Sequence, residues 1–213
     1  MRIPTLAVLV FATGALAACG GATSDGPRRG TPIVLEIESA GILDGFVRND
    51  GMVSTSGNGP GVGDLDEATT GLAFRMFYAF PLAEIPEGVT VTSVRLRVFQ
   101  VSIVGSPYED LGDLLVDHVD PGAGLDAGDY AGSTLSSNIG ILAMGFGQNY
   151  ANLGVSAEVD ADRSAERSHS WFRLRFPVDS NTDRGNDVLV LGDGEGSRGP
   201  MNPPILEVTY VVP

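Results

Sequence analysis

Apolar and polar positions alternate most regularly between Gly71 and Gln100. In the first half of this stretch, one face of the predicted strand carries Phe74, Met76, Tyr78, Phe80 and Leu82. This period of two is typical of a strand with one buried face. In the second half, mostly β-branched residues hold the apolar positions, as strands favour; they are Val89, Val91, Val94, Leu96 and Val98. With the turn AEIPEG between them, the two strands predict an antiparallel β-sandwich.

Similar patterns predict further strands on both sides of this stretch. They lie at residues 33–38, 44–55, 114–120, 154–159 and 170–178, in DVLVL, and in the C-terminal PPILEVTYVV. Residues 121–153 are rich in glycine and predict a long irregular insertion with one short strand, STLSSNIGILAM. Asp160 to Arg167 predicts one or two helical turns. We therefore expect an all-β, jelly-roll-like antiparallel sandwich of about nine or ten strands, with at most one short helix.

The first 18 residues differ from the rest, with one positive charge followed by an apolar run and small residues. This pattern predicts a secretory signal peptide. Leu16-Ala17-Ala18-Cys19 resembles a bacterial lipobox, in which the cysteine is acylated, and Cys19 is the only cysteine of the chain. The alternative is an ordinary signal followed by an incidental cysteine. We expect lipidation at Cys19, because this single cysteine lies where the lipobox requires one. Several acyl chains on one residue would give lasting membrane attachment.

The lipidated chain is expected to divide into a flexible tether, residues 19–30, and one β-sandwich domain, residues 31–213. Gly20 after the cysteine, rather than aspartate, resembles the outer-membrane sorting pattern of bacteria with two membranes. The sequence thus predicts an exported domain anchored by lipid in the cell envelope.

The chain is acidic and contains no lysine, with a net charge of −14. Removal of residues 1–18, which hold Arg2 and no acid, leaves 12 arginines against 27 acidic residues, a net charge of −15. Such a surface repels nucleic acid, so we expect no nucleic-acid partner.

Several arginines alternate with the core positions of three predicted strands. They and one tryptophan make up the candidate ligand-binding set Arg75, Arg95, Arg97, Trp171, Arg173 and Arg175. If these strands share a sheet, the set would form an outward arginine and aromatic platform suited to an acidic polysaccharide, with guanidinium groups on carboxylates and a ring stacked on a sugar. The alternative is ordinary cross-strand pairing of arginines with Glu36, Glu38 or Glu207.

The segment DSNTDRGND offers a second candidate site. Its oxygen-bearing residues Asp179, Asn181, Asp183 and Asp187 could converge on calcium from one loop. The spacing does not match an EF-hand, because Gly185 comes one place late and Val190 stands where glutamate is needed. The alternative is a hairpin loop held by Asx turns.

Catalytic motifs are scarce. The two histidines are His118 and His169, and neither a nucleophile elbow nor a zinc-protease motif is present. His118 falls on an apolar face, which favours a core or rim histidine with its hydrogen bonds satisfied. The alternative to a non-enzymatic protein is a pair of carboxylates that hydrolyses glycosides. We therefore expect a protein without enzymatic activity.

The order of several motifs is similar to the DNRLRE-type domain family, which is related to disaggregatase-like domains and grouped with carbohydrate-binding modules. The motifs are DGFVRND at 44–50, FPLAEIPEGVTVTSVRLRVFQ at 80–100, DLLVDHVDPG at 113–122, LDAGDY at 125–130, FRLRF at 172–176, and NDV with PPILEVTY near the end. The chain departs from the family at Phe46, usually tyrosine, at Val94, usually alanine, and in a shorter helix before Trp171. The resemblance implies a β-sandwich that binds polysaccharide in some members.

Two functions follow as expectations. The first is a lipid-anchored envelope protein that binds polysaccharide, and an outward arginine and aromatic face would favour it. The second is a structural or adhesive envelope module with a protein partner, which an exposed apolar patch or an unpaired edge strand would favour instead.

Overall fold

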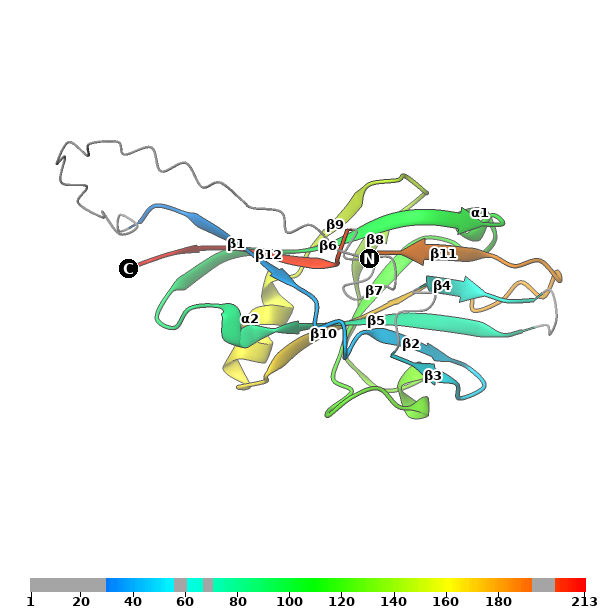
Figure 1. Ribbon diagram of the computed structural model, residues 1–213, viewed down its shortest axis with the longest axis horizontal. Coiled ribbons are helices and arrows are strands. Elements are labelled where there is room, and N and C mark those ends of the chain that lie inside the picture. The colour runs from blue at the N-terminus through cyan, green and yellow to red at the C-terminus, as the bar shows by residue number, and fades with distance from the viewer. Residues whose placement is uncertain (1–29, 56–60, 67–70, 193–201) are drawn as a thin grey trace, which may run out of the picture.

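The computed structural model describes residues 30–55, 61–66, 71–192 and 202–213. In this part of the chain the fold is all-β and antiparallel, so the predicted fold class is confirmed (Figure 1). The predicted signal peptide, Cys19 and nearly all of the tether lie outside the described residues.

The described chain contains twelve strands where nine or ten were expected. They are β1 (Ile33–Glu38), β2 (Gly45–Arg48), β3 (Val53–Ser54), β4 (Gly61–Asp64), β5 (Ala73–Pro81), β6 (Thr90–Val104), β7 (Leu114–Val119), β8 (Thr134–Ala143), β9 (Tyr150–Gly154), β10 (His169–Arg175), β11 (Val188–Leu191) and β12 (Ile205–Val211).

Two α-helices and two short 3-10 helices connect these strands: α1 (Pro107–Asp110), α2 (Ser156–Ser164), η1 (Leu82–Glu84) and η2 (Ala127–Tyr130). The expectation of at most one short helix is therefore wrong. The predicted helical turns correspond to α2, which begins at Ser156 rather than at residue 160 and replaces the end of the strand expected at 154–159. The single turn of α1 has proline at its first position, where the missing N–H group is tolerated.

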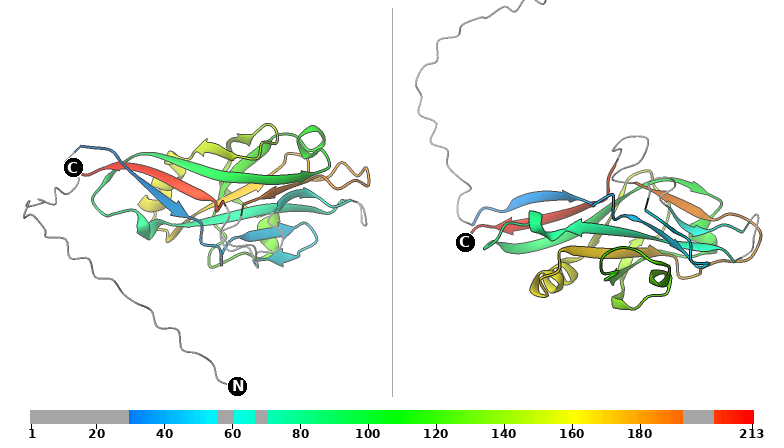
Figure 2. Two further views of the ribbon diagram at one scale, coloured as in Figure 1. Left: turned by 45° about the horizontal axis from the view of Figure 1, so that its top comes forward. Right: turned by 60° about the horizontal axis from the view of Figure 1, so that its bottom comes forward.

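The strands form one continuous sheet that curls on itself. Neighbours follow the order β1-β12-β6-β11-β4-β5-β10-β7-β8, with β2 beside β5, β3 beside β2, and β9 beside β6. β6 joins the two halves, because it pairs with β12 and β9 as far as Phe99 and with β11 from Gln100 onward. We call β1, β12, β9 and the first part of β6 the first layer (Figure 2). The second layer contains, in spatial order, β11, β4, β5, β10, β7 and β8.

The two strands of the most regular stretch, β5 and β6, do not pair with each other. β5 pairs with β10, β2 and β4, whereas β6 pairs with β12, β11 and β9. The connection between β5 and β6 includes η1, Pro86 and Gly88, whose φ is +71°. This connection is longer than a tight hairpin turn and carries the chain from one layer to the other.

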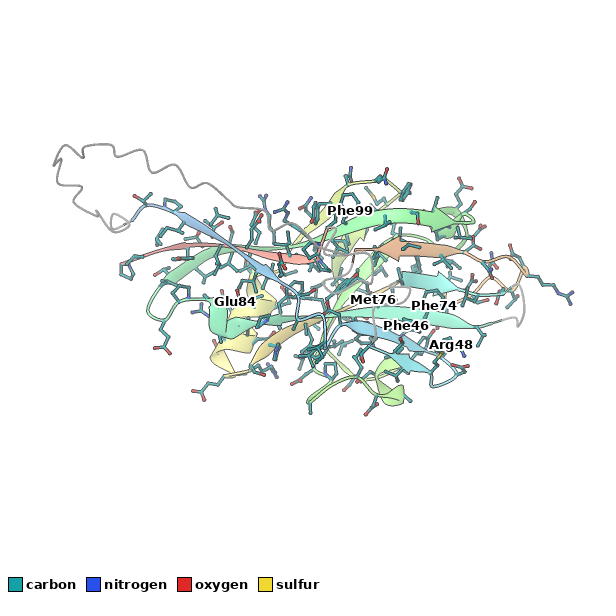
Figure 3. The ribbon with its side chains drawn as sticks, viewed as in Figure 1. Phe46, Arg48, Phe74, Met76, Glu84 and Phe99 are labelled. Carbon is teal, nitrogen blue, oxygen red and sulfur yellow. The ribbon has the colours of Figure 1, made fainter. Side chains whose placement is uncertain are left out.

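The main core lies between the layers. The first layer contributes Val94, Leu96 and Val98 of β6, and the second contributes Met76, Tyr78 and Phe80 of β5 with Phe172 and Leu174 of β10. In β5 and β6 these are positions that the alternation assigned to the buried face, and all eight residues are at most 1 % exposed. Figure 3 labels Phe74 and Met76, neighbours on this face, beside Phe46 of β2.

The buried residues of this core fall between residues 37 and 208, and the strands pair from Ile33 to Val211. All of these residues lie at or after Ile33. A protein that starts at residue 24 retains every one of these residues.

Candidate functional site

The outward face of the second layer is covered rather than open. On this face a second buried cluster contains Val47, Phe77, Ala79, Val119 and Trp171, with Leu43, Leu125 and Tyr130 packed against it. Trp171 is only 3 % exposed. The expectation of an outward aromatic platform on these strands is therefore wrong at Trp171, because the segments before β2 and after β7 fold over this outward face of the sheet.

Arg173 is buried beneath the same cover. Its guanidinium donates to Asp117 Oδ2 from Nε (3.1 Å) and Nη2 (2.9 Å), and its side chain is 6 % exposed. Its Nη1 group donates to the main-chain oxygens of Asp129 (3.1 Å), Tyr130 (3.3 Å) and Gly132 (3.1 Å). Three of these five hydrogen bonds join β10 to the segment after β7, and the other two join it to Asp117 of β7. Arg173 therefore does not face solvent as expected.

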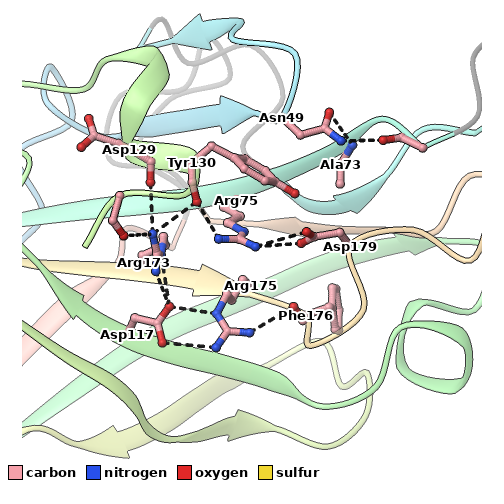
Figure 4. A network of polar contacts seen from close by, with 12 residues as sticks. Asn49, Ala73, Arg75, Asp117, Asp129, Tyr130, Arg173, Arg175, Phe176 and Asp179 are labelled. Atoms are coloured by element: carbon pink, nitrogen blue, oxygen red, sulfur yellow. Dashed lines mark hydrogen bonds and ion pairs between the residues drawn. The ribbon is translucent and has the colours of Figure 1, made fainter. Parts of the chain in front are cut away.

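Asp117 is the carboxylate at the centre of this cluster and is fully buried. It also accepts hydrogen bonds from Arg175 Nε (2.9 Å) and from the main-chain N–H of Asn138 (2.8 Å). Burial raises the pKa of the Asp117 carboxyl, but the hydrogen bonds from Arg175, Asn138 and Arg173 outweigh it and hold the pKa below its ordinary value. Asp117 is therefore a charged acceptor for two guanidinium groups (Figure 4).

Arg75 completes the network from β5. Its Nη1 donates to the main-chain oxygen of Tyr130 (2.6 Å), and its Nη2 donates to both oxygens of Asp179 (2.9 and 3.3 Å). The guanidinium carbon also lies 4.2 Å from the centre of the Tyr130 ring, a cation–π contact. Arg75, Arg173 and Arg175 are thus brought together as expected, but they bind the protein's own oxygens.

Arg95 and Arg97 lie on the first layer, in the part of β6 that pairs with β12 and β9. The six candidate residues therefore do not form one surface. Arg97 Nη1 contacts Glu36 (2.5 Å) and Glu207 (3.1 Å), which is the cross-strand pairing named as the alternative. Arg95 is exposed and has no hydrogen bond or ion pair within the described parts of the chain.

Two aromatic rings stand beside these arginines. The centroids of Phe99 and Tyr150 lie 5.2 Å apart in an edge-on arrangement, and the Arg97 guanidinium carbon lies 4.8 Å from the Tyr150 ring centre. Burial raises the pKa of Tyr150; the nearby Glu36 and Glu38 add to this effect and Arg97 opposes it. We define the β6–β9 surface as the outward side chains of Glu36, Arg95, Arg97, Phe99, Tyr150, Asn152 and Glu207.

The four candidate calcium ligands do not converge. Asp179 points to Arg75. Asp183 accepts from the main-chain N–H of Gly185, and Asn181 Oδ1 accepts from that of Asp183 at 3.0 Å, which are Asx turns. Asp187 is buried and accepts from the Ser106 N–H (2.6 Å). Within the described ranges, no group of three His, Cys, Asp or Glu side chains is arranged to hold a metal ion.

Two buried aspartates on the far side of the same loop were not anticipated. Asp64 Oδ1 accepts from the Asp187 N–H (2.9 Å), and Asp66 Oδ2 accepts from the Ser180 hydroxyl (2.6 Å). Burial raises the pKa of Asp64, and the neighbouring charges of Asp66 and Asp187 raise it further. These carboxylates hold the loop in place by hydrogen bonds. The loop has the Asx turns that were named as the alternative to a calcium site.

His118 is 2 % exposed and lies 2.8 Å from Asp162 Oδ2 through Nε2, so the interpretation as a satisfied core histidine agrees with its position. Ser170 donates to the same Asp162 oxygen, and Arg167 donates to the other oxygen at 3.0 Å. Asp162, rather than the histidine, is therefore the hub. A serine nucleophile with a histidine base needs the imidazole between the serine and the acid, which this arrangement does not provide.

Tyr150 and Asn152 were missed because they sit in FGQNYANLG, which its glycines marked as irregular. The only signal was the short alternation within Tyr150–Gly154, where Ala151 is buried. No known family model matches the chain, and no curated protein matches it in sequence. Neither α-helix in the described residues is long and apolar enough to span a membrane.

Proposed function

We propose that the protein is a lipid-anchored component of the cell envelope that binds polysaccharide on the β6–β9 surface and has no catalytic role. The observation that carries this proposal is exposed Arg95, which has no hydrogen bond or ion pair to any described residue, on the sheet face that also presents the Tyr150 and Phe99 rings. Sugars offer hydroxyl groups and apolar ring faces, so polar side chains and aromatic rings on one sheet face complement them.

Charge favours an acidic sugar at one position only. Arg97 is already paired with Glu36 and Glu207, so it chiefly orders the surface. Arg95 has no such partner in the described chain and can offer a planar fork to a uronate carboxylate. Asn152 projects from the adjacent strand β9, where Arg97 is its register partner, and supplies an amide for sugar hydroxyls. We expect the bound glycan to lie across β6 and β9.

The test is retention of the protein comprising residues 24–213 on immobilised polyuronate and on neutral polysaccharides, with calcium and with chelator. We expect retention on polyuronate that weakens in Arg95→Gln and in Tyr150→Ala. Arg184→Gln is the matched control, because it removes one positive charge from an exposed position in the loop before β11, outside the β6–β9 surface. Absence of retention from a folded sample, or equal retention of Arg95→Gln and wild type, would contradict the proposal.

The anchor requires its own test. The full chain, expressed with its leader in a bacterial host, is expected to incorporate labelled fatty acid and to sediment with membranes. Cys19→Ser is expected to abolish both, because it removes the only thiol of the chain. Label in the Cys19→Ser protein would contradict lipidation at Cys19.

A second candidate is a structural or adhesive module with a protein partner. It is favoured by exposed apolar side chains on β8 and the turn that follows it, at Leu135, Ile141, Met144 and Phe146. Exposed apolar groups gathered on an edge strand are typical of protein contact sites.

A further inference from the structure

β8 forms one end of the described sheet and pairs with β7 alone. Of its ten residues only Leu142 is buried. Leu135 is 43 % exposed and Ile141 is 45 % exposed, and the following turn adds Met144 at 76 %. An edge strand of this length presents unpaired backbone N–H and C=O groups that can pair with another strand.

The same segment lacks charge. No Asp, Glu, Lys or Arg occurs between Asp129 and Glu158, the longest uncharged stretch in a chain of net charge −14. The opposite end of the sheet differs, because β1 carries Glu36 and Glu38. Charged side chains on an edge strand disfavour pairing with a second molecule, and β8 carries none.

We propose that two copies of this chain associate through β8, with the two strands antiparallel across a two-fold axis. A strand is complementary to its own copy in this arrangement, since the same backbone groups donate and accept on both sides. Two molecules of net charge −14 repel one another over most of their surfaces, and the segment 130–157 is where they can approach with the least repulsion. The proposal specifies a partner for the second candidate function and does not depend on polysaccharide binding.

The geometry limits how much of β8 can pair. Its register with β7 shifts at three points, and Asn138, in the middle of the strand, has a φ of +51°. Such irregularities shorten the continuous edge. The regular part lies around Gly140 and Ile141, which face Val116 and Leu115 of β7. We therefore expect a short pairing extended by Met144 and Phe146, and a dimer far weaker than one that buries about 800 Å² on each partner.

The test is sedimentation velocity of the protein comprising residues 24–213 from about micromolar to about millimolar concentration, a range that covers weak association. We expect a reversible dimer whose dissociation constant rises about tenfold or more in Ile141→Lys, because the two-fold axis brings the new charges together. Ile42→Lys is the matched control. Ile42 is 73 % exposed and lies in the turn before β2, and its substitution is expected to leave association unchanged.

Salt gives an independent readout. Screening of two like-charged molecules should tighten this dimer several-fold between about 50 and 500 mM NaCl, whereas a contact made by opposite charges would weaken. Met144→Lys should repeat the effect of Ile141→Lys if the latter variant is poorly folded. A monomer at every concentration, equal association of wild type and both variants, or a monomer that instead binds neutral lipid vesicles through Met144 would overturn the proposal.

Discussion

Arg173 lies under the segment that follows β7 with its side chain 6 % exposed, whereas Arg95 stands in solvent on the other layer. A buried guanidinium requires acceptors for its donors, because desolvation of a charge is costly. Asp117 and three main-chain oxygens provide them. Arg173 therefore stabilises the cover over the sheet, whereas Arg95 has no partner among the described residues and is the arginine that we propose to bind the ligand.

Asp117→Asn tests the structural role of this network. The substitution keeps the size of the side chain and removes the charge opposite two guanidinium groups, one of them buried. We expect a loss of about 3 kcal/mol in the free energy of unfolding, typical of breaking a buried ion pair, measured by chemical denaturation. Asp50→Asn removes the carboxylate of an exposed pair with Arg48 and should leave the denaturation midpoint unchanged; an equal effect of both variants would contradict the assignment.

The same carboxylate predicts a pH dependence. Because the pKa of Asp117 is lowered in the folded state, its contribution is fully present above the unfolded value of about 3.9 and is lost as the pH falls through the folded pKa. The difference in unfolding free energy between wild type and Asp117→Asn should be constant above about pH 5 and shrink below about pH 4. Burial raises the pKa values of Asp64 and Asp129, but both proteins contain these groups, so their effects cancel. A difference that grows towards low pH would contradict the prediction.

At the scale of strands, alternation shows which residues share a face but not whether that face is open. The inward residues of β5 and β10 could be predicted for this reason, and they are buried. Trp171 was expected to face outward on β10, yet it is 3 % exposed, and Phe77 and Ala79 on the same face of the sheet are fully buried. The apolar side chains of Phe77 and Ala79 on the outward face of β5 were the available sign that this face is also buried. The cover itself comes from irregular segments whose long-range placement has no local period.

The elements that were missed share a dependence on distant contacts. β9 pairs with β6, which begins sixty positions earlier in the chain, from Tyr150 opposite Phe99 to Gly154 opposite Arg95. The glycines of this region predicted a loop from local preference. Long-range pairing overrode that preference, and with it Tyr150 entered the candidate binding surface.

One glycine is required where two strands approach closely. Gly63 in β4 has a φ of +135°, and a Cβ there would lie 1.9 Å from the main-chain oxygen of Asp187 beside β11. Gly63→Ala should lower the free energy of unfolding by about 3 kcal/mol through backbone strain and the clash. Gly124→Ala is the matched control, because a Cβ at Gly124 meets nothing within 4 Å. Equal melting temperatures for the two variants would show that β4 and β11 are not held this closely.

For the whole molecule, the two proposed surfaces lie on different parts of the curled sheet. The β6–β9 surface belongs to the first layer, and β8 ends the second layer. Salt should act on them in opposite directions, because polyuronate binding through Arg95 is an attraction between opposite charges and β8 pairing is opposed by like charges. A single salt series thus distinguishes the two contacts.

Net charge also predicts how salt affects the fold. With 27 acidic residues against 13 arginines and no lysine, repulsion within the compact chain exceeds that in the expanded unfolded chain. Screening should therefore raise the melting temperature by a few degrees between about 20 and 500 mM NaCl, measured on dilute protein so that dimer formation does not contribute. Asp117→Asn should show a similar rise. The ion pairs that this substitution removes are largely buried, so salt screens them little in the wild type. A melting temperature that falls with salt would instead mean that attractive surface pairs such as Arg97 with Glu36 and Glu207 outweigh the repulsion among the remaining carboxylates.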